Sequence, residues 1–422
     1  MRILLINQFF PPDAAPTGHM LASVARELSA KGHQVSVICS SGGYADVSRD
    51  RPDDRFPEGE AKVFRTPTLR LGRKVGIGKV IDYGLFFAGS LVVALKLLKR
   101  PDRVIVLSTP PFLSCFARVF SKFLRADHGH WIMDVYPDVI QAHGLMSSSS
   151  MAYRLLQRAM RWGLSGKRSA VVHTLSSDMA GRLQDYVSNG KSVDWTPLWN
   201  TDGDEMTATD DCVREEGVDD LRERRGWGRD EVVFVYSGNM GLGHRFQELR
   251  AVLGNESESI SGARVAFFGG GPRRDEVEGI VQSSVSIPAE IGDYVPQEEL
   301  SRHLRTADVH LVSLEPSWTA LMAPSKLQGV FAAGRPTIFI GSVGSSMARW
   351  VLDADAGWVV EPGDVAALWR AMRSALDADV RRRKGANAHQ FARANFSENR
   401  NAALVADLLS SPMARGNQTE GA

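Results

Sequence analysis

Short apolar runs alternate with amphipathic segments along almost the whole 422-residue chain. In the first half, the apolar runs predict strands at 2–7, 34–40, 103–108, 130–136 and 169–176. The amphipathic segments predict helices at 20–31, 77–99, 113–125, 151–166 and 177–186. Strands that are apolar on both faces and separated by helices are typical of a parallel sheet covered on both sides.

A second alternation of the same kind begins at residue 232. It predicts strands at 232–238, 264–271, 310–315, 337–340 and 357–360, and helices at 246–253, 274–283 and 365–376. The expected fold class is therefore α/β, with two Rossmann-like, doubly wound parallel-sheet domains. In such domains the ligand sites lie at the carboxyl ends of the strands, here facing an interdomain cleft.

The length of the chain suits two domains rather than one core. The first domain is expected at 1–200 and the second at 232–386. The segment 201–231 is dense in Asp, Glu and Arg, which indicates a charged linker with some helix. The last residues, 411–422, have the composition of a disordered tail.

Composition narrows the function. A net charge of +1 argues against a nucleic-acid-binding protein. Cys39, Cys115 and Cys212 are far apart and odd in number, so they indicate neither a disulfide framework nor a zinc site. No signal-peptide pattern follows Met1, and the longest apolar stretch, 85–98, is shorter than the ~20 residues of a membrane span. We therefore expect a cytoplasmic protein with reduced thiols.

The segment 324–341, PSKLQGVFAAGRPTIFIG, predicts a turn, a short apolar helix and a buried strand in succession. Ser325 stands at the N-cap position, where unpaired backbone N–H groups and the helix dipole favour an anion. Lys326 adds a full positive charge there. A lysine on a helix is usually only solvated, but its position after the serine favours a diphosphate site.

Two glycine-rich turns follow strands of the second domain. The strand predicted at 232–238 ends in Gly238 and is followed by Asn239. Arg245 comes six residues after Asn239, and its guanidinium can hold a phosphate with two hydrogen bonds. Taken alone, a solvated arginine is the better explanation; beside Lys326, a phosphate contact is. Gly271 belongs to the run GGGP, a second turn that a ligand can approach closely.

The turn after the first strand lacks the G-x-G-x-x-G spacing of an NAD-binding unit, which weakens the case for a dehydrogenase. Instead, a long loop containing prolines leads to Thr17 and Gly18 at the start of a helix. Glycine there would let a phosphate approach the backbone. An ordinary loop with a helix cap explains the pattern equally well.

Carboxylates stand at two further strand ends. Asp134 is a candidate to orient an acceptor hydroxyl, contact a sugar or act as a base; capping the following turn is about as good an explanation. Glu361 is a candidate for the nucleotide site, whereas Asp364 most simply caps the next helix. His128 and His130 lack carboxylate partners and make a poor metal site, so no metal is expected.

Basic and aromatic stretches, 65–79, 96–103 and 154–168, are confined to the first half, which also holds the apolar face of 85–98. Together they favour contact with an anionic membrane surface. Taken singly, each is explained at least as well by a helix that covers a sheet and has a solvated outer face.

In this order along the chain, the motifs resemble glycosyltransferase family 4, in the branch that builds bacterial surface polysaccharides of the colanic-acid type. The resemblance rests on Pro11-Pro12 with Gly18, LASVARELSAKGHQVSVI, WIMDVYPD, YSGNMG, FFGGGP, ADVHLVSLEP, PSKLQGVFAAGRP and GWVVEPGD. It implies a GT-B fold with a C-terminal helix, here 387–410, that crosses back to the first domain. It also implies hexosyl transfer with retention, without metal or organic cofactor, from a nucleotide sugar in the second domain to an acceptor in the first.

Two departures from the family pattern concern the donor site. The family's pair of glutamates, counted back from Gly334, falls on Leu321 and Gly329, so both carboxylates are missing. Gln328 is the candidate that replaces the second glutamate at the nucleotide ribose. A histidine that often precedes the strand-end aspartate aligns with Met133, so sugar recognition by that histidine does not carry over.

We therefore expect sugar transfer from a nucleotide diphosphate to a hydroxyl of a lipid-linked or polysaccharide precursor, at a cytoplasmic site or on the cytoplasmic membrane face. Arg245, Lys326 and the N–H groups at Ser325 and Gly18 would stabilise the departing diphosphate. The alternatives are a nucleotide-sugar 2-epimerase on the same fold and a non-catalytic nucleotide-binding scaffold of a polysaccharide assembly complex. The identity of the base, the sugar and the acceptor, and the oligomeric state, do not follow from the sequence.

Overall fold

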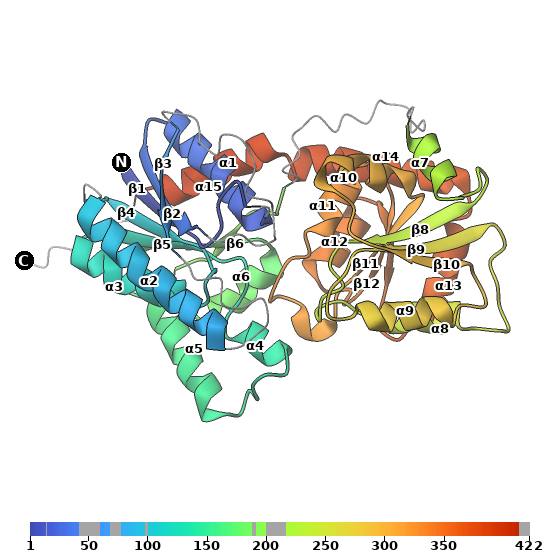
Figure 1. The fold of residues 1–422 in the computed structure, drawn as a ribbon, viewed down its shortest axis with the longest axis horizontal. Helices are drawn as coiled ribbons and strands as arrows, with labels where there is room; N and C mark the ends of the chain where they lie inside the picture. The colour runs from blue at the N-terminus through green and yellow to red at the C-terminus, as the bar shows by residue number, and fades with distance from the viewer. Residues whose placement is uncertain are drawn as a thin grey trace, which may run out of the picture. The chain divides into compact units, whose positions relative to one another are not determined.

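The computed structural model describes residues 1–13, 15–41, 60–67, 77–97, 100–187, 191–199 and 217–412. The chain forms two compact units (Figure 1). The first consists of Met1–Pro197 and Glu398–Ala422, and the second of Leu198–Ser397. Each contains one parallel sheet with helices on both faces, which confirms the expected α/β class.

The sheet of the first unit has the order β3-β2-β1-β4-β5-β6-β7. Its strands are β1 (Arg2–Ile6), β2 (Gln34–Ser40), β3 (Lys62–Thr66), β4 (Arg103–Val106), β5 (Asp127–Trp131), β6 (Ser169–Thr174) and β7 (Asp194–Trp195). Its helices are α1 (Pro16–Ala30), α2 (Ile77–Leu97), α3 (Leu113–Leu124), α4 (Asp138–Ala142), α5 (Met151–Leu164), α6 (Ser177–Gln184) and α15 (Glu398–Ser410). The strand order reverses between β1 and β4, so this unit has the switch point of a doubly wound sheet.

Apolar side chains of α2 and α3 form one core with β1, β2 and β4; Phe86 and Phe120 are buried in it. Helix α15 packs against α1. The buried Arg103 of β4 donates hydrogen bonds to the carbonyls of Leu409, at 2.6 Å, and Ser411, at 2.8 Å. These bonds fasten the end of α15 to the first unit.

The sheet of the second unit has the order β10-β9-β8-β11-β12-β13. Its strands are β8 (Val232–Ser237), β9 (Ala263–Phe268), β10 (Ala289–Gly292), β11 (Val309–Ser313), β12 (Thr337–Ile340) and β13 (Gly357–Val360). Helices α8 (Gln247–Leu253), α9 (Arg274–Gln282) and α13 (Val365–Ser374) pack with the larger core cluster. The remaining helices are α7 (Val218–Arg224), α10 (Gln297–Thr306), η1 (Pro316–Trp318), α11 (Lys326–Ala332), α12 (Ser346–Asp353) and α14 (Ala378–Asn395). The switch point here lies between β8 and β11.

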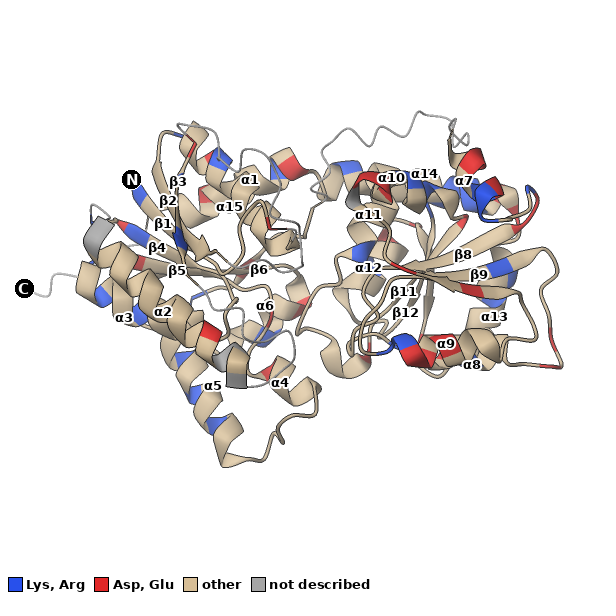
Figure 2. Ribbon diagram, in the orientation of Figure 1, with Lys and Arg blue, Asp and Glu red and all other residues tan. Residues whose placement is uncertain are grey.

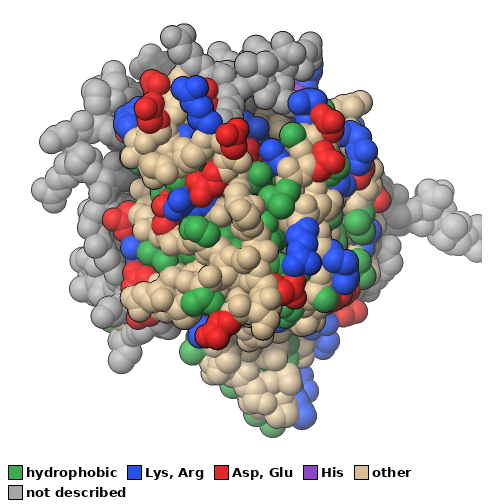
Figure 3. Space-filling model, turned by 90° about the vertical axis from the view of Figure 1, so that its right-hand side faces the viewer, with side chains coloured by type: hydrophobic (Ala, Val, Ile, Leu, Met, Phe, Trp, Pro, Cys, Tyr) green, Lys and Arg blue, Asp and Glu red, His purple; other side chains and the backbone are tan. Residues whose placement is uncertain are grey.

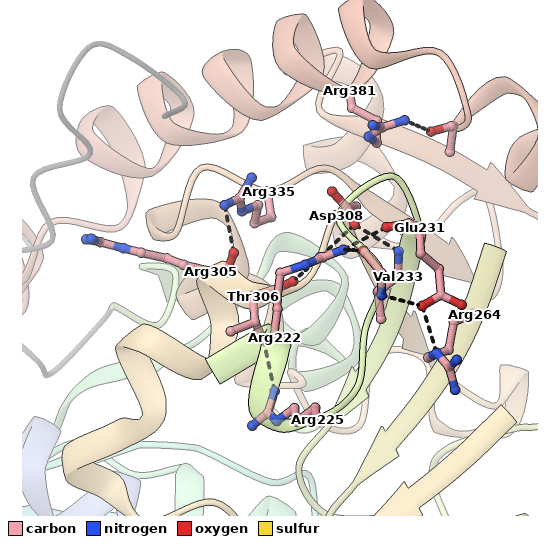
Figure 4. A network of polar contacts seen from close by, with 12 residues as sticks. Arg222, Arg225, Glu231, Val233, Arg264, Arg305, Thr306, Asp308, Arg335 and Arg381 are labelled. Carbon is pink, nitrogen blue, oxygen red and sulfur yellow. Dashed lines mark hydrogen bonds and ion pairs between the residues drawn. The ribbon is translucent and has the colours of Figure 1, made fainter. Parts of the chain in front are cut away.

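Of the charged segment 201–231, expected to be a linker with some helix, the described residues from 217 onward include helix α7 and belong to the second unit. The buried Arg222 of α7 donates to Asp308 Oδ2 at 2.9 Å and to the carbonyls of Thr306 and Glu231 at 2.7 Å each (Figure 4). Asp308 Oδ2 also accepts from the N–H of Val233 at 2.9 Å. The charges of this segment are thus partly structural. Residues 201–216 and 413–422 lie outside the described residues.

The predicted helix at 387–410 is two helices, α14 in the second unit and α15 in the first. They are separated at Phe396, whose ring is buried among aromatic side chains of the second unit. Its centroid lies 5.3 Å from that of Trp350 and 5.5 Å from that of Phe391. This packing fixes the end of α14.

The strand predicted at 130–136 also differs from the structure. Strand β5 ends at Trp131, and it begins earlier in the sequence and includes the buried His128 and His130.

Candidate functional site

Lys326, the first residue of α11, reaches the carboxyl end of β8. Its ammonium donates hydrogen bonds to the Tyr236 hydroxyl at 2.7 Å, the Asn239 carbonyl at 2.9 Å and Nε2 of His244 at 3.0 Å. Nζ also lies 4.4 Å from the centroid of the Tyr236 ring, within cation–π range. All three ammonium protons therefore have neutral acceptors.

His244 is held as a neutral ring in one tautomer. Its Nδ1 lies 2.6 Å from the carbonyl of Ser313, which can only accept, so Nδ1 carries the proton and Nε2 is free to accept from Lys326. Burial, with the charge of Lys326, lowers the pKa of His244 to about 3. His244 was not among the candidate site residues, although it directly precedes Arg245 in the same loop.

The charge of Lys326 is not balanced locally. Within the described ranges, no carboxylate forms an ion pair with Lys326. Burial lowers the pKa of Lys326 to about 7. A cation held by neutral dipoles, at the switch point of the sheet, gains most from an anionic ligand.

The two glycine-rich turns lie side by side at this strand end. The Gly238 N–H donates to the Phe268 carbonyl at 2.8 Å. A Cβ on Gly238 would lie 3.0 Å from Cε of Lys326, and a Cβ on Gly271, where φ is +132°, would lie 2.4 Å from Oδ1 of Asn239. The structure thus brings Gly238, Asn239 and Gly271 together with Lys326. The absence of a side chain at Gly271 serves the packing of the two loops.

Ser325 does not cap α11, which contradicts the expected geometry. It adopts helical angles, φ −75° and ψ −1°, its side chain makes no capping bond, and it is exposed.

Gln328 is only 2 % exposed, and neither the oxygen nor the nitrogen of its side-chain amide forms a hydrogen bond within the described part of the chain. Glu361 is exposed and accepts a hydrogen bond from the Val343 N–H at 3.0 Å. The predicted cap at Asp364 is confirmed: it accepts from the N–H of Ala367 at 2.8 Å.

The structure does not support Arg245 as a phosphate contact. Its Nε donates to both oxygens of the Glu248 carboxylate, at 3.2 and 3.0 Å, and its Nη1 to Glu315 Oε2 at 2.8 Å. Its Nη2 donates to Oε1 of Glu248 at 2.6 Å. These hydrogen bonds raise the pKa of Arg245. Because two carboxylates surround one guanidinium, the cluster carries a net negative charge and does not attract an anion.

Thr17 and Gly18 belong to the first unit, at the start of α1. A Cβ on Gly18 would lie 3.1 Å from the backbone nitrogen of Phe10, so glycine lets the preceding loop pack on the helix. The Gly18 N–H already donates to the Ala15 carbonyl at 2.9 Å. A role for Thr17 and Gly18 in binding phosphate stays a prediction.

Asp134 follows β5 in the first unit. Its N–H and that of Met133 donate to the Ser108 hydroxyl at 3.1 Å each, which fixes the backbone after β4 and β5. Burial raises the pKa of Asp134 to about 6. Within the described part of the chain, its carboxylate forms no hydrogen bond or ion pair. A carboxylate with such a pKa is suited to accept a proton near neutral pH.

A neighbouring acid was missed. Asp138 is 3 % exposed and accepts hydrogen bonds from Tyr153, Arg182 and Tyr186. Its satisfied carboxylate joins α4, α5 and α6, which indicates a structural role.

The described ranges contain no group of three or more His, Cys, Asp or Glu arranged to hold a metal ion.

Part of the sequence matches a known protein domain. Residues 17–199 match the model of the glycosyl transferase 4-like domain. Over 387 residues, 90 % of each chain, the sequence is 23 % identical to the probable glycosyltransferase WbjE of Pseudomonas aeruginosa. Residues 17–199 of the chain thus carry a glycosyl transferase 4-like domain.

Solved structures of glycosyltransferases share the fold of this chain. The structure of HepE of Anabaena, in complex with UDP, has a TM-score of 0.69 at 12 % identity and covers 98 % of this chain and 100 % of its own. The glycosyltransferase WaaG, involved in lipopolysaccharide biosynthesis, has a TM-score of 0.67 at 14 % identity, covering 97 % and 100 %. The protein is a glycosyltransferase with the GT-B fold.

Of the described helices of this glycosyltransferase, none combines the length and hydropathy needed to cross a membrane. The first unit nevertheless exposes large apolar side chains on neighbouring helices. They are Ile81, Leu85, Leu91, Val92 and Leu95 on α2, Val119 and Phe123 on α3, and Met151, Leu155 and Trp162 on α5. Figure 2 shows basic positions along α3 and α5. On the face of the second unit drawn in Figure 3, acidic and basic side chains are interspersed and apolar ones are scattered.

Proposed function

We propose that this glycosyltransferase moves a hexose from a nucleoside-diphosphate sugar to a hydroxyl of a lipid-linked or polysaccharide precursor in cell-surface polysaccharide biosynthesis. The observation that carries the proposal is the charge of Lys326, which no carboxylate of the described residues pairs, beside two glycine turns at the β8–β11 switch point. A diphosphate supplies the negative charge that the site lacks. The UDP in the HepE complex is a nucleoside diphosphate of this kind, and WaaG acts in a related type of pathway.

In the proposed reaction, Lys326 stabilises the negative charge that develops on the leaving diphosphate, a role that a metal ion fills elsewhere. The transfer needs no metal and no organic cofactor, and retains the anomeric configuration as the family resemblance implies. Gln328, two residues after Lys326 in α11, is buried and has no hydrogen-bond partner among the described residues; it is the proposed ribose contact. Asp134 of the first unit is the proposed base or orienting group for the acceptor hydroxyl.

The exposed apolar side chains of α2, α3 and α5 lie among basic residues such as Arg154, Arg158 and Lys122. This combination suits the headgroup region of an anionic bilayer, where a lipid-linked acceptor is found. We therefore assign peripheral binding at the cytoplasmic membrane face to the first unit as part of the proposal.

A thermal-shift panel tests the proposal. The purified protein is heated with UDP, GDP, ADP, dTDP or NAD, in the presence of EDTA. Selective stabilisation by one nucleoside diphosphate is expected, because a ligand that binds only the folded state raises the melting temperature. The shift should shrink in Lys326→Met and persist in Lys384→Met, which removes a lysine paired with Asp355 at 2.5 Å in the same unit. No shift with any nucleotide, or a shift with NAD alone, would contradict the proposed donor site.

A further inference from the structure

Ser237, the last residue of β8, is linked to a chain of side chains that the reaction described above does not use. Its Oγ lies 3.1 Å from Nε2 of His303 in α10. The other ring nitrogen of His303, Nδ1, lies 2.9 Å from Nη2 of Arg225. His303 is 66 residues from Ser237 and 78 from Arg225 in the sequence, and the fold brings it to both.

Arg225 determines which atoms donate in the hydrogen bonds that link Ser237, His303 and Arg225. A guanidinium can only donate, so Nδ1 of His303 must be the acceptor and carries no proton. The proton of the neutral ring is then on Nε2, which donates to Ser237 Oγ. His303 is fully buried, and burial, with the charge of Arg225, lowers its pKa to about 3, so the ring stays neutral.

Arg225 is itself held in place by neutral groups. Nη1 donates to the Thr306 hydroxyl at 3.0 Å, as seen in Figure 4, and the guanidinium carbon lies 4.5 Å from the ring centroid of Phe268 and 4.9 Å from that of Trp227. In the described part of the chain, no carboxylate pairs with Arg225. Its charge therefore polarises His303, and through His303 the hydroxyl of Ser237.

Ser237 is left with one unused donor. Its oxygen accepts from His303, and no described residue accepts its proton. The side chain of Ser237 is half-buried, and Ser237 directly precedes Gly238, where an added Cβ would lie 3.0 Å from Cε of Lys326. Ser237 thus brings a polarised O–H donor to the strand end that the Lys326 ammonium also reaches, and such a donor is suited to an anionic oxygen of a ligand.

We propose that Ser237 is a further donor-binding residue, which donates a hydrogen bond to a diphosphate oxygen of the nucleotide sugar, and that His303 and Arg225 are the residues that position it. This inference rests on the proposed function, since it concerns the same diphosphate. The diphosphate would then be held by the neutral hydroxyl of Ser237 as well as by the ammonium of Lys326. Tight binding would therefore require the hydroxyl at position 237.

Calorimetric titration tests this assignment with two probes, inorganic pyrophosphate and the nucleoside diphosphate that stabilises the wild type most. Ser237→Ala should weaken the binding of both about tenfold, the cost of one hydrogen bond to a charged group. Ser237→Thr, which keeps the hydroxyl, should bind within about twofold of the wild type. Ser286→Ala is the matched control, because its hydroxyl bonds the Val252 carbonyl at 2.7 Å before β10; its affinity should not change.

A double-mutant cycle tests whether His303 positions the Ser237 hydroxyl or only fills space in the core. His303→Phe preserves a ring against Phe268 but cannot donate to Ser237. It should weaken both probes like Ser237→Ala, and the double variant should be no weaker than either single variant. Equal affinity in Ser237→Ala, a loss confined to the nucleotide, or additive losses would overturn this assignment while leaving the donor site intact. A wild type that binds neither probe would overturn the proposed function itself.

Discussion

The ammonium of Lys326 donates a hydrogen bond to Nε2 of His244 across 3.0 Å. A cation is thus held in a largely desolvated position by a neutral imidazole, with a tyrosine hydroxyl and a backbone carbonyl as its other acceptors. Each acceptor satisfies a proton, but none neutralises the charge. The hydrogen-bonding capacity of Lys326 is therefore filled, while its positive charge is left for an anionic ligand to neutralise.

Replacing Lys326 by methionine should lower the rate of sugar transfer about a hundredfold, or ~3 kcal/mol of transition-state stabilisation. The protein should stay folded, because the variant removes a buried charge rather than breaking an ion pair. Steady-state kinetics with the donor selected by the thermal-shift panel, together with circular dichroism, checks both expectations. Unchanged turnover would show that Lys326 does not face the leaving group.

Binding of a nucleoside diphosphate should take up protons above neutral pH. Burial lowers the pKa of Lys326 to about 7, so at pH 8 the free protein carries mostly neutral lysine. A bound dianion favours the ammonium, and binding should take up about one proton at pH 8 and less at pH 6. Calorimetry in buffers of different ionisation enthalpy measures this number. A wild type with the same proton uptake as Lys326→Met would contradict the assignment.

Asp134→Asn should abolish most transfer while raising the melting temperature. Burial raises the pKa of Asp134 to about 6, above its unfolded value, so the charged carboxylate costs folding free energy at pH 7 and an amide removes that cost. Thermal unfolding and transfer assays at pH 7 test the two effects. Asp127→Asn, at the start of the same strand, is the control and should leave the transfer rate unchanged. A lower melting temperature with normal transfer would instead indicate the turn-capping role.

Glu248→Gln should destabilise the second unit by about 3 kcal/mol, because it leaves the buried Arg245 without its principal carboxylate. Glu258→Gln, which breaks the exposed pair with Arg373, should cost less than about 1 kcal/mol. Urea unfolding gives both free energies. Equal costs for the two variants would mean that the Arg245 cluster is solvated and free to bind a phosphate after all.

The strands could be predicted wherever both faces of the sheet are buried. In β8, five consecutive apolar residues are buried, and the run in the sequence is unmistakable. Strand β10, by contrast, is only half-buried along its length, and β5 carries the buried histidines 128 and 130, so neither has the expected apolar run. The polar helix α10 was missed for the same reason, although it positions His303.

The candidate site was predictable only where its residues lie close in the sequence or share a strand end. The neighbourhood of Lys326 and Gly238 followed from the rule that parallel strands end at one edge of the sheet. The partners of Arg245 did not, because Glu315 is 70 residues away and pairs with it only in the fold. Glu248, in the first turn of α8, is three residues from Arg245, and this spacing was a readable signal for an ion pair.

The most direct test of the donor site is a crystal structure with the nucleoside diphosphate that gives the largest thermal shift. The account predicts a terminal phosphate oxygen about 3 Å from Lys326 Nζ, a charge-assisted hydrogen bond. A nucleotide bound in the second unit with its phosphates away from Lys326, beside Arg245 for example, would contradict it.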